Sequence, residues 1–315
     1  MQNAPEVRIT GSGLVTCLGT SQEATLAAIR AGDRVRGNPF PFLTDTPYSG
    51  YLVAQEQEPD LRDRISDRRM RKFMSRHAEL AAVAAREALA EANLPARGIQ
   101  PERIGLYAGV GLAAMDITVS TKLLRVSLSE TGSFSLDRFC RDGLRTIHPL
   151  WSFHTLANMP ACIVSVLEGI KGDNGIYTPW EDQTAFALLE AAHALHEGTI
   201  DAAVVVASDT PSHPASMVDL ASSGFIAPGE IVASGAACLV LERPDTPAPT
   251  RPFSRLSNLN LIASEPEDAL SDPLAPIIGR TLAAAPLILV ILAPLLDLPC
   301  RLRGSGGHSF SFGAA

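Results

Sequence analysis

Short apolar runs alternate along this chain with longer segments of helical period, and that alternation restricts it to layered α/β folds. Strands are predicted where apolar residues run together, at residues 104–110, 202–207 and 236–242. The clearest helix is predicted over residues 75–93, because leucine and alanine recur there at i, i+4 and i+8. The sequence therefore predicts sheets covered by helices.

The same patterns predict further elements, with an irregular loop over residues 35–60, which are rich in Pro, Gly and Asp. Further helices are predicted from residue 21 and over residues 113–129, 159–169, 181–197 and 266–282. Further strands are predicted at residues 7–10, 175–178, 256–262 and 287–292.

Length and charge narrow the class of protein. With 315 residues, 46% of them hydrophobic, the chain can bury one large domain or two fused halves. Its net charge of −8 argues against a nucleic-acid-binding face, which needs a basic patch. An acidic partner would need a local basic cluster, and residues 62–72 form the only dense one.

The five cysteines are scattered, without any Cys-x-x-Cys pair, which favours a reduced, cytoplasmic protein over a disulfide framework or zinc site. Residues 1–20 show no pattern of a secretory signal. The apolar stretch 281–296 contains two prolines and is shorter than the roughly 20 residues of a spanning helix, so a buried strand at 287–292 is expected and no membrane span.

Six segments stand out together, namely residues 9–19, 67–94, 158–178, 201–209, 235–242 and 308–313. In their order and spacing they resemble segments of the β-ketoacyl synthases (ketosynthases). The resemblance implies a thiolase-like, five-layered α/β/α/β/α fold with two similar halves. The expected halves are residues 1–160 and 161–315, with the second shortened because the region between Glu242 and His308 is too short for a full half. The family is usually dimeric, which implies that a strand of Gly175, Ile176, Tyr177 and Thr178 pairs across the dimer axis.

The resemblance also locates the family's nucleophilic cysteine. Counting forward from residues 158–178 places that position in residues 179–182, where this chain carries Glu181. A carboxylate cannot hold an acyl chain as a stable thioester. One family histidine is missing, since Leu292, Ala293 and Pro294 stand nearest to its motif. His308 matches the other loosely, but His308, Phe310, Phe312 and Gly313 better resemble the family's terminal turn.

This pattern resembles chain-length factors, the inactive partners of ketosynthases in type II polyketide systems, and among them the short subunits of aryl-polyene-type systems. The resemblance implies a heterodimer with an active ketosynthase, an acyl carrier protein as partner through that complex, and no cofactor or metal. The helix at 113–124 would close the acyl tunnel, with Met115, Thr118 and Leu123 limiting chain growth by steric contact. The alternative that these three residues simply pack in the core stays open.

Two other functions stay open. A malonyl-carrier decarboxylase could use Glu181, since burial can raise the pKa of a carboxyl group, although an ion pair or hydrogen bond that braces the interface is the simpler role. A homodimeric acyl-binding scaffold is the third interpretation. Glu190, His193 and His196 share a helix but lack further ligands for a metal, and Cys162 lacks a nearby base.

Overall fold

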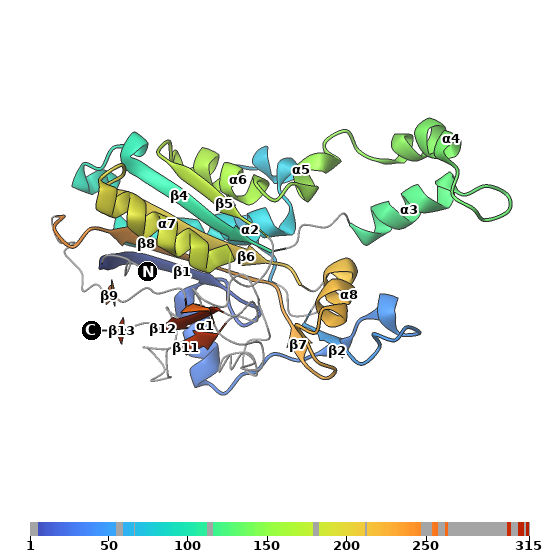
Figure 1. The fold of residues 1–315 in the computed structure, drawn as a ribbon, viewed down its shortest axis with the longest axis horizontal. Helices are drawn as coiled ribbons and strands as arrows, with labels where there is room; N and C mark the ends of the chain where they lie inside the picture. The colour runs from blue at the N-terminus through green and yellow to red at the C-terminus, as the bar shows by residue number, and fades with distance from the viewer. Residues whose placement is uncertain are drawn as a thin grey trace.

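The computed structural model describes residues 6–54, 59–65, 67–111, 116–178, 183–211 and 213–246, and short strands beyond them (Figure 1). Its centre is a seven-stranded sheet in the order β13-β9-β1-β8-β6-β4-β5. The strands are β1 (Val7–Val15), β4 (Ile104–Val110), β5 (Asn174–Tyr177), β6 (Ala202–Asp209), β8 (Gly235–Glu242), β9 (Ser254–Ser257) and β13 (Gly313–Ala314).

Strand direction changes in the middle of this sheet. Strands β6, β4 and β5 run parallel, whereas β8 is antiparallel to both β6 and β1. Every residue of β4, β6 and β8 is buried, as expected for strands covered on both faces.

Helices cover both faces of the sheet (Figure 1). On one face lie α2 (Arg76–Ala92) and α6 (Met159–Glu168), which pack with β1, β4, β6 and β8 into one apolar cluster. On the other lie α1 (Gln22–Arg30) and α7 (Gln183–Glu197), which form a second cluster with alternate residues of the same strands. The part of the chain described here thus forms an α/β/α layered unit.

The predicted helix at 75–93 is confirmed as α2, whose caps are Ser75 and Asn93. The Ser75 hydroxyl accepts a hydrogen bond from the Ala78 N–H, and Asn93 ends α2 in the left-handed conformation. Glycines let this helix lie close on β1, because a Cβ on Gly13 would sit 2.0 Å from the carbonyl oxygen of Ala84. The strand therefore runs on through the glycines to Val15, beyond the predicted residues 7–10.

β9 pairs only with the first residues of β1, and two carboxylates of α2 accept hydrogen bonds from backbone N–H groups further along β1. Glu91 accepts from the backbone N–H of Ser12 at 2.8 Å, and Glu87 from that of Leu14 at 2.9 Å. Burial is the main reason why the pKa of Glu87 is raised.

Smaller elements flank the main sheet. A small sheet contains β2 (Asn38–Pro39), β3 (Leu52–Val53) and β7 (Ile231–Val232), and it packs with α8 (Pro214–Ser222) around Phe40. Of these elements, β2 and β3 lie within residues 35–60, which were predicted as a loop. A third sheet has the order β10-β12-β11. Its strands are β10 (Ile262–Ala263), β11 (Arg301–Arg303) and β12 (His308–Ser311). Short 3₁₀ turns lie at Pro41–Leu43, Arg62–Arg64, Met70–Phe73, Pro95–Arg97, Pro101–Arg103 and Leu144–Thr146.

Residues 116–147 form an arm that projects from the body (Figure 1). The arm contains α3 (Ile117–Ser127), α4 (Leu136–Arg138), a π-helical turn at Phe139–Gly143 and the 3₁₀ turn at Leu144–Thr146. The chain returns to the body through α5 (Trp151–Thr155). Of these elements the sequence predicted only α3.

The expected division into halves at residue 160 stays a prediction. That boundary cuts through α6, and the main sheet joins β1 and β4 from before it to β5, β6 and β8 from after it. The first layered unit therefore extends through β8. The predicted helix at 266–282 and strand at 287–292 lie outside the described residues.

Candidate functional site

A cavity of about 390 Å³ lies beside the carboxyl end of β6 and the start of α3. Open α/β sheets bind ligands at the carboxyl ends of their strands, and the volume is typical of small-molecule sites, roughly 300–1,000 Å³. The apolar part of its wall is formed by Phe40, Phe42, Met74, Ile117, Val119 and Trp151.

Three imidazoles line the same cavity. His77 lies in the first turn of α2 and is 4% exposed. Its Nε2 lies 2.7 Å from the hydroxyl oxygen of Thr210, the residue that follows β6. His154 of α5 donates through Nε2 to the carbonyl oxygen of Lys72 at 3.0 Å. His213 caps α8, where its Nδ1 accepts from the N–H of Ala215 at 3.2 Å. The first bond joins α2 to the segment after β6, the second joins α5 to the turn before α2, and the third is local to the start of α8.

One carboxylate faces the imidazoles. Asp116 caps α3 by accepting the N–H groups of Thr118 and Val119, and it accepts the Thr118 hydroxyl as well. That hydroxyl is the largest cause of a lowered Asp116 pKa, with the two backbone N–H groups and the nearby His213 acting in the same direction. The walls combine aromatic rings, imidazoles and a carboxylate, which suits a ligand with an apolar body and a polar end.

The position expected for a nucleophile lies between β5 and α7. Glu181 and its neighbours 179–182 fall outside the described residues, but the sequence of this segment contains no cysteine. α7 begins at Gln183, and Thr184 lies so close to Gly109 of β4 that a Cβ there would be 2.3 Å from the Thr184 hydroxyl. The start of α7 thus packs against the carboxyl end of β4.

The described cysteines lie elsewhere in the fold. Cys17 and Cys238 are buried, and burial raises the pKa of the Cys238 thiol. Cys140 and Cys162 are exposed, on the arm and on α6 respectively. None of these four thiols lines the cavity.

Two of the three residues predicted to face the tunnel are described by the structure. Met115 lies outside the described residues, and Thr118 is exposed with its hydroxyl on Asp116. Leu123 packs inside the arm, where its Cδ1 would be 3.0 Å from a Cβ on Gly143. The residues of α3 that line the cavity are Ile117 and Val119, which are not among the three predicted residues. A tunnel role for the predicted three stays a prediction.

The strand predicted to pair across a dimer lies at the edge of the main sheet. β5 pairs with β4, and within the described residues no strand occupies its other edge. Tyr177 ends β5 and Tyr107 lies on β4 opposite Gly175. Burial is the main cause that raises the pKa of both phenols, that of Tyr177 to about 12. Asp173 adds to both shifts through its negative charge. Thr178 follows the strand directly.

The remaining predicted residues that the structure describes belong to other elements of the fold. His308 and Phe310 belong to β12 and Gly313 to β13, so strands occupy much of the expected terminal turn, and Phe312 lies outside the described residues. His193 and His196 are exposed on α7. The described residues contain no group of three His, Cys, Asp or Glu placed to hold a metal ion, and no helix among them is long and apolar enough to cross a membrane.

Comparison with known proteins identifies the family. Residues 4–245 match the model of the beta-ketoacyl synthase N-terminal domain, and the chain belongs to this family. It is similar to 3-oxoacyl-[acyl-carrier-protein] synthase 2 of Staphylococcus aureus, with 25% identity over 231 residues. That match covers 72% of this chain and 50% of the relative, so the chain spans about half the length of such relatives.

Solved structures show the same fold. A type II PKS ketosynthase complex with its acyl-carrier protein, AntDE:AntF, matches with a TM-score of 0.74 and 17% identity, covering 100% of both chains. The ishigamide ketosynthase/chain length factor matches with a TM-score of 0.61, 18% identity and coverage of 86% of this chain and 70% of that one. The ketosynthase ApeO with its chain length factor ApeC, from Xenorhabdus doucetiae, matches with a TM-score of 0.56, 15% identity and coverage of 95% and 71%.

Proposed function

We propose that this chain is a non-catalytic, chain-length-factor-like subunit that pairs with an active ketosynthase. The observation that carries the proposal is the segment between β5 and α7. In a ketosynthase-family fold this segment leads to the nucleophile, and here its residues 179–182 are Pro, Trp, Glu and Asp. Without a cysteine in this segment, no thiolate stands at the family's nucleophile position to take over an acyl chain as a thioester.

The open edge of β5 supports a paired state. An exposed row of backbone N–H and C=O groups is a template for another strand, and β5 is short and half-buried at Gly175, Ile176 and Tyr177. The proposed partner is a ketosynthase that supplies the cysteine and both histidines. Solved chains with this fold include ketosynthases with chain length factors, which is in line with that choice.

In the proposed complex the partner elongates an acyl chain held on an acyl carrier protein, in a type II system of the aryl-polyene kind, within the cytoplasm. This chain limits product length by placing side chains in the path of the growing acyl group. Met115, Thr118 and Leu123 are the proposed length-setting residues. A methylene that meets such a side chain loses the roughly 0.8 kcal/mol of its burial and adds strain.

The test is co-expression with an active type II ketosynthase, followed by the size and elongation activity of each protein alone and together. A 1:1 complex that elongates malonyl-carrier, with neither protein active alone, is expected. Ile176→Pro removes a backbone N–H from β5 and should weaken the complex. Thr118→Trp should shorten the product if Thr118 faces the tunnel.

Two outcomes would refute the proposal. Release of CO₂ from malonyl-carrier by this chain alone, lost in Glu181→Ala, would make it a decarboxylase. A stable homodimer of this chain that does not bind the ketosynthase would identify the chain as an acyl-binding scaffold.

A further inference from the structure

The cavity of about 390 Å³ beside β6 is separate from the position where the family carries its nucleophile. Its walls come from the start of α2, the start of α3, α5, the turn that contains Phe42, and the segments that follow β6 and precede β8. The nucleophile segment leads into α7, and no residue of α7 is among the described residues that line the cavity. The cavity can therefore hold a ligand that the proposed subunit function does not require.

Asp116 places a negative charge on the wall of this cavity. Its Oδ1 accepts the backbone N–H groups of Thr118 and Val119 at 2.8 Å and 3.2 Å, and it accepts the Thr118 hydroxyl as well. Its Oδ2 takes part in none of these bonds, and no arginine or lysine of the described residues pairs with the carboxylate. Because the Thr118 hydroxyl and the other hydrogen bonds lower the pKa of Asp116, the carboxylate stays ionised at neutral pH.

The guanidinium on the described part of the wall is already paired. The Nη1 of Arg76 lies 3.1 Å from the carboxylate of Glu79, and its Nη2 donates to the carbonyl oxygen of Pro59 at 2.7 Å. Histidine side chains ordinarily carry no charge at pH 8, so the imidazoles of the wall add no fixed positive charge there. The charge that a ligand meets in this cavity is therefore the negative charge of Asp116.

Aromatic rings line the same cavity as this carboxylate. They belong to Phe40, Phe42 and Trp151. The rings of Phe40 and Phe42 lie 5.7 Å apart, and Phe40 is buried whereas Phe42 is 57% exposed. The face of an aromatic ring attracts an organic cation, and it also packs against the apolar part of a ligand. A carboxylate and aromatic rings around one space are suited to a protonated amine.

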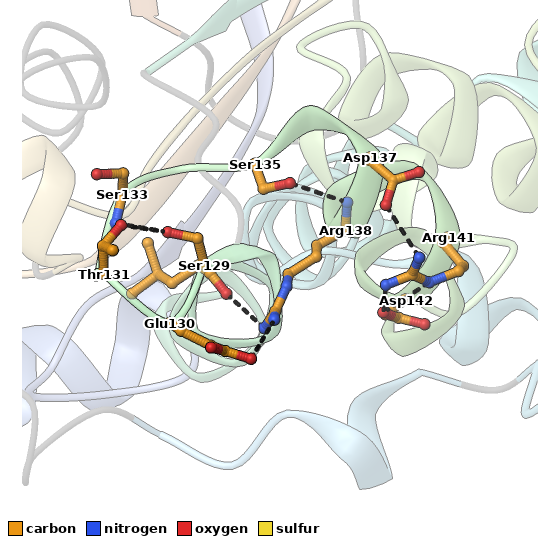
Figure 2. Close-up of polar contacts among 10 residues, drawn as sticks. Ser129, Glu130, Thr131, Ser133, Ser135, Asp137, Arg138, Arg141 and Asp142 are labelled. Carbon is orange, nitrogen blue, oxygen red and sulfur yellow. Dashed lines mark hydrogen bonds and ion pairs between the residues drawn. The ribbon is translucent and has the colours of Figure 1, made fainter.

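The carboxylate is held in place because α3 is braced at both ends. Asp116 caps its first turn. Just beyond its last turn, the guanidinium of Arg138 donates to the carbonyl oxygen of Leu128 at 2.9 Å. Figure 2 shows Arg138 turned toward Glu130, whose carboxylate lies 3.8 Å from it. A group that is already fixed loses little conformational freedom when a ligand binds, which favours affinity.

We propose that this cavity binds a protonated primary amine that carries an apolar, aromatic body. The ammonium group donates to Oδ2 of Asp116, and the aromatic body packs against Trp151 and Phe42. A hydrogen bond between two ionised groups is stronger than one between neutral groups, so the carboxylate sets the preference for a cation. This site is additional to the proposed pairing with a ketosynthase and does not rest on it.

The experiment titrates the full chain at pH 8 with 2-phenylethylamine, and isothermal titration calorimetry measures the dissociation constant. Phenylacetate carries the same ring with the opposite charge, and it should bind at least about ten-fold more weakly than the amine. Asp116→Asn keeps a good capping residue for α3 but removes the charge, so it should weaken amine binding by about ten-fold or more. Trp151→Leu should weaken amine binding by about three-fold or more, because a ring of the wall is lost.

Asp137→Asn is the matched control variant. It removes the same charge from an exposed carboxylate of the arm that pairs with Arg141 and does not line the cavity, so it should leave the affinity for the amine unchanged. Far-ultraviolet circular dichroism of each variant verifies that the fold is kept.

Three results would overturn the proposal. They are no measurable binding of the amine to the wild type, equal affinity of the wild type and Asp116→Asn for the amine, and tighter binding of phenylacetate than of the amine. The last result would identify the imidazoles as part of an anion site. Because this titration uses the chain alone, a failure here leaves the pairing with a ketosynthase standing, and a failure of that pairing leaves the amine site standing.

Discussion

The buried ion pair between Arg97 and Glu242 offers the sharpest test of the fold. Glu242 ends β8 and its side chain is fully buried. Arg97, in the turn after α2, donates from Nη1 to Oε1 at 2.5 Å and from Nη2 to Oε2 at 2.6 Å. The Thr10 hydroxyl donates to the same carboxylate at 2.6 Å, so the pair joins the end of α2 to β1 and β8.

Arg97→Met removes two donors and leaves Glu242 with too few partners in a site that water does not reach. Breaking a buried pair in this way costs about 3–5 kcal/mol, because the remaining charge stays desolvated. For a chain of this size the melting temperature should fall by roughly 5–15 °C. Urea unfolding followed by circular dichroism measures the free energy directly.

Two comparisons define what would refute this reasoning. Arg97→Met with Glu242→Met removes both charges and should be more stable than Arg97→Met alone. Arg103→Met breaks a pair with Asp201 whose side chains are 38% and 33% exposed, so its cost should stay near or below about 1 kcal/mol. If Arg97→Met costs no more than Arg103→Met, burial does not control the strength of these pairs.

Three further predictions follow from the described contacts. Gly13→Ala should lower the free energy of unfolding in urea by about 1–3 kcal/mol, because its Cβ would lie 2.0 Å from the Ala84 carbonyl oxygen. Gly50→Ala is the control, because its Cβ would lie 3.4 Å from the nearest atom and should lower the free energy of unfolding far less. Equal losses in the two variants would contradict the close approach of α2 to β1. Burial raises the pKa of Tyr177 to about 12, above the value of about 10 for an unfolded chain, so the folded state holds the phenol proton more tightly. The contribution of this proton to the free energy of unfolding is therefore lost as pH rises from 10 to 12. Tyr177→Phe lacks that effect, so the difference in unfolding free energy between wild type and variant should fall across this range, and a constant difference would refute the assignment. Ser75→Ala removes the cap of α2 and should lower the unfolding free energy by about 0.5–2 kcal/mol, whereas Ser75→Asp should retain it.

Much of the secondary structure was predictable because its causes are local. Ser75 and Asn93 mark the ends of α2 through their own hydrogen bonds and backbone conformation. β4 matches its predicted residues 104–110 because a short apolar run with glycines fits a fully buried strand. The absence of a cysteine in residues 179–182 is also a property of the sequence alone.

The candidate site was less predictable because it joins distant residues. His77, His154 and His213 come from three separate helices and meet only because α2, α5 and the segment after β6 pack at one end of the sheet. A signal was present for His213, since polar residues that follow a buried parallel strand often line a site. No comparable signal was present for His77, which lies within an apolar helical pattern.

The sequence by itself determined the α/β class, the bounds of its most regular elements and the family, since periodicity and capping act over a few residues. Tertiary structure alone decided that β8 lies between β1 and β6, that Glu87 and Glu91 bond to β1, and that Phe134 and Leu136 stand uncovered on a projecting arm. These features depend on which distant surfaces meet. Burial and partner choice are set by the whole packed fold, and no local pattern encodes them.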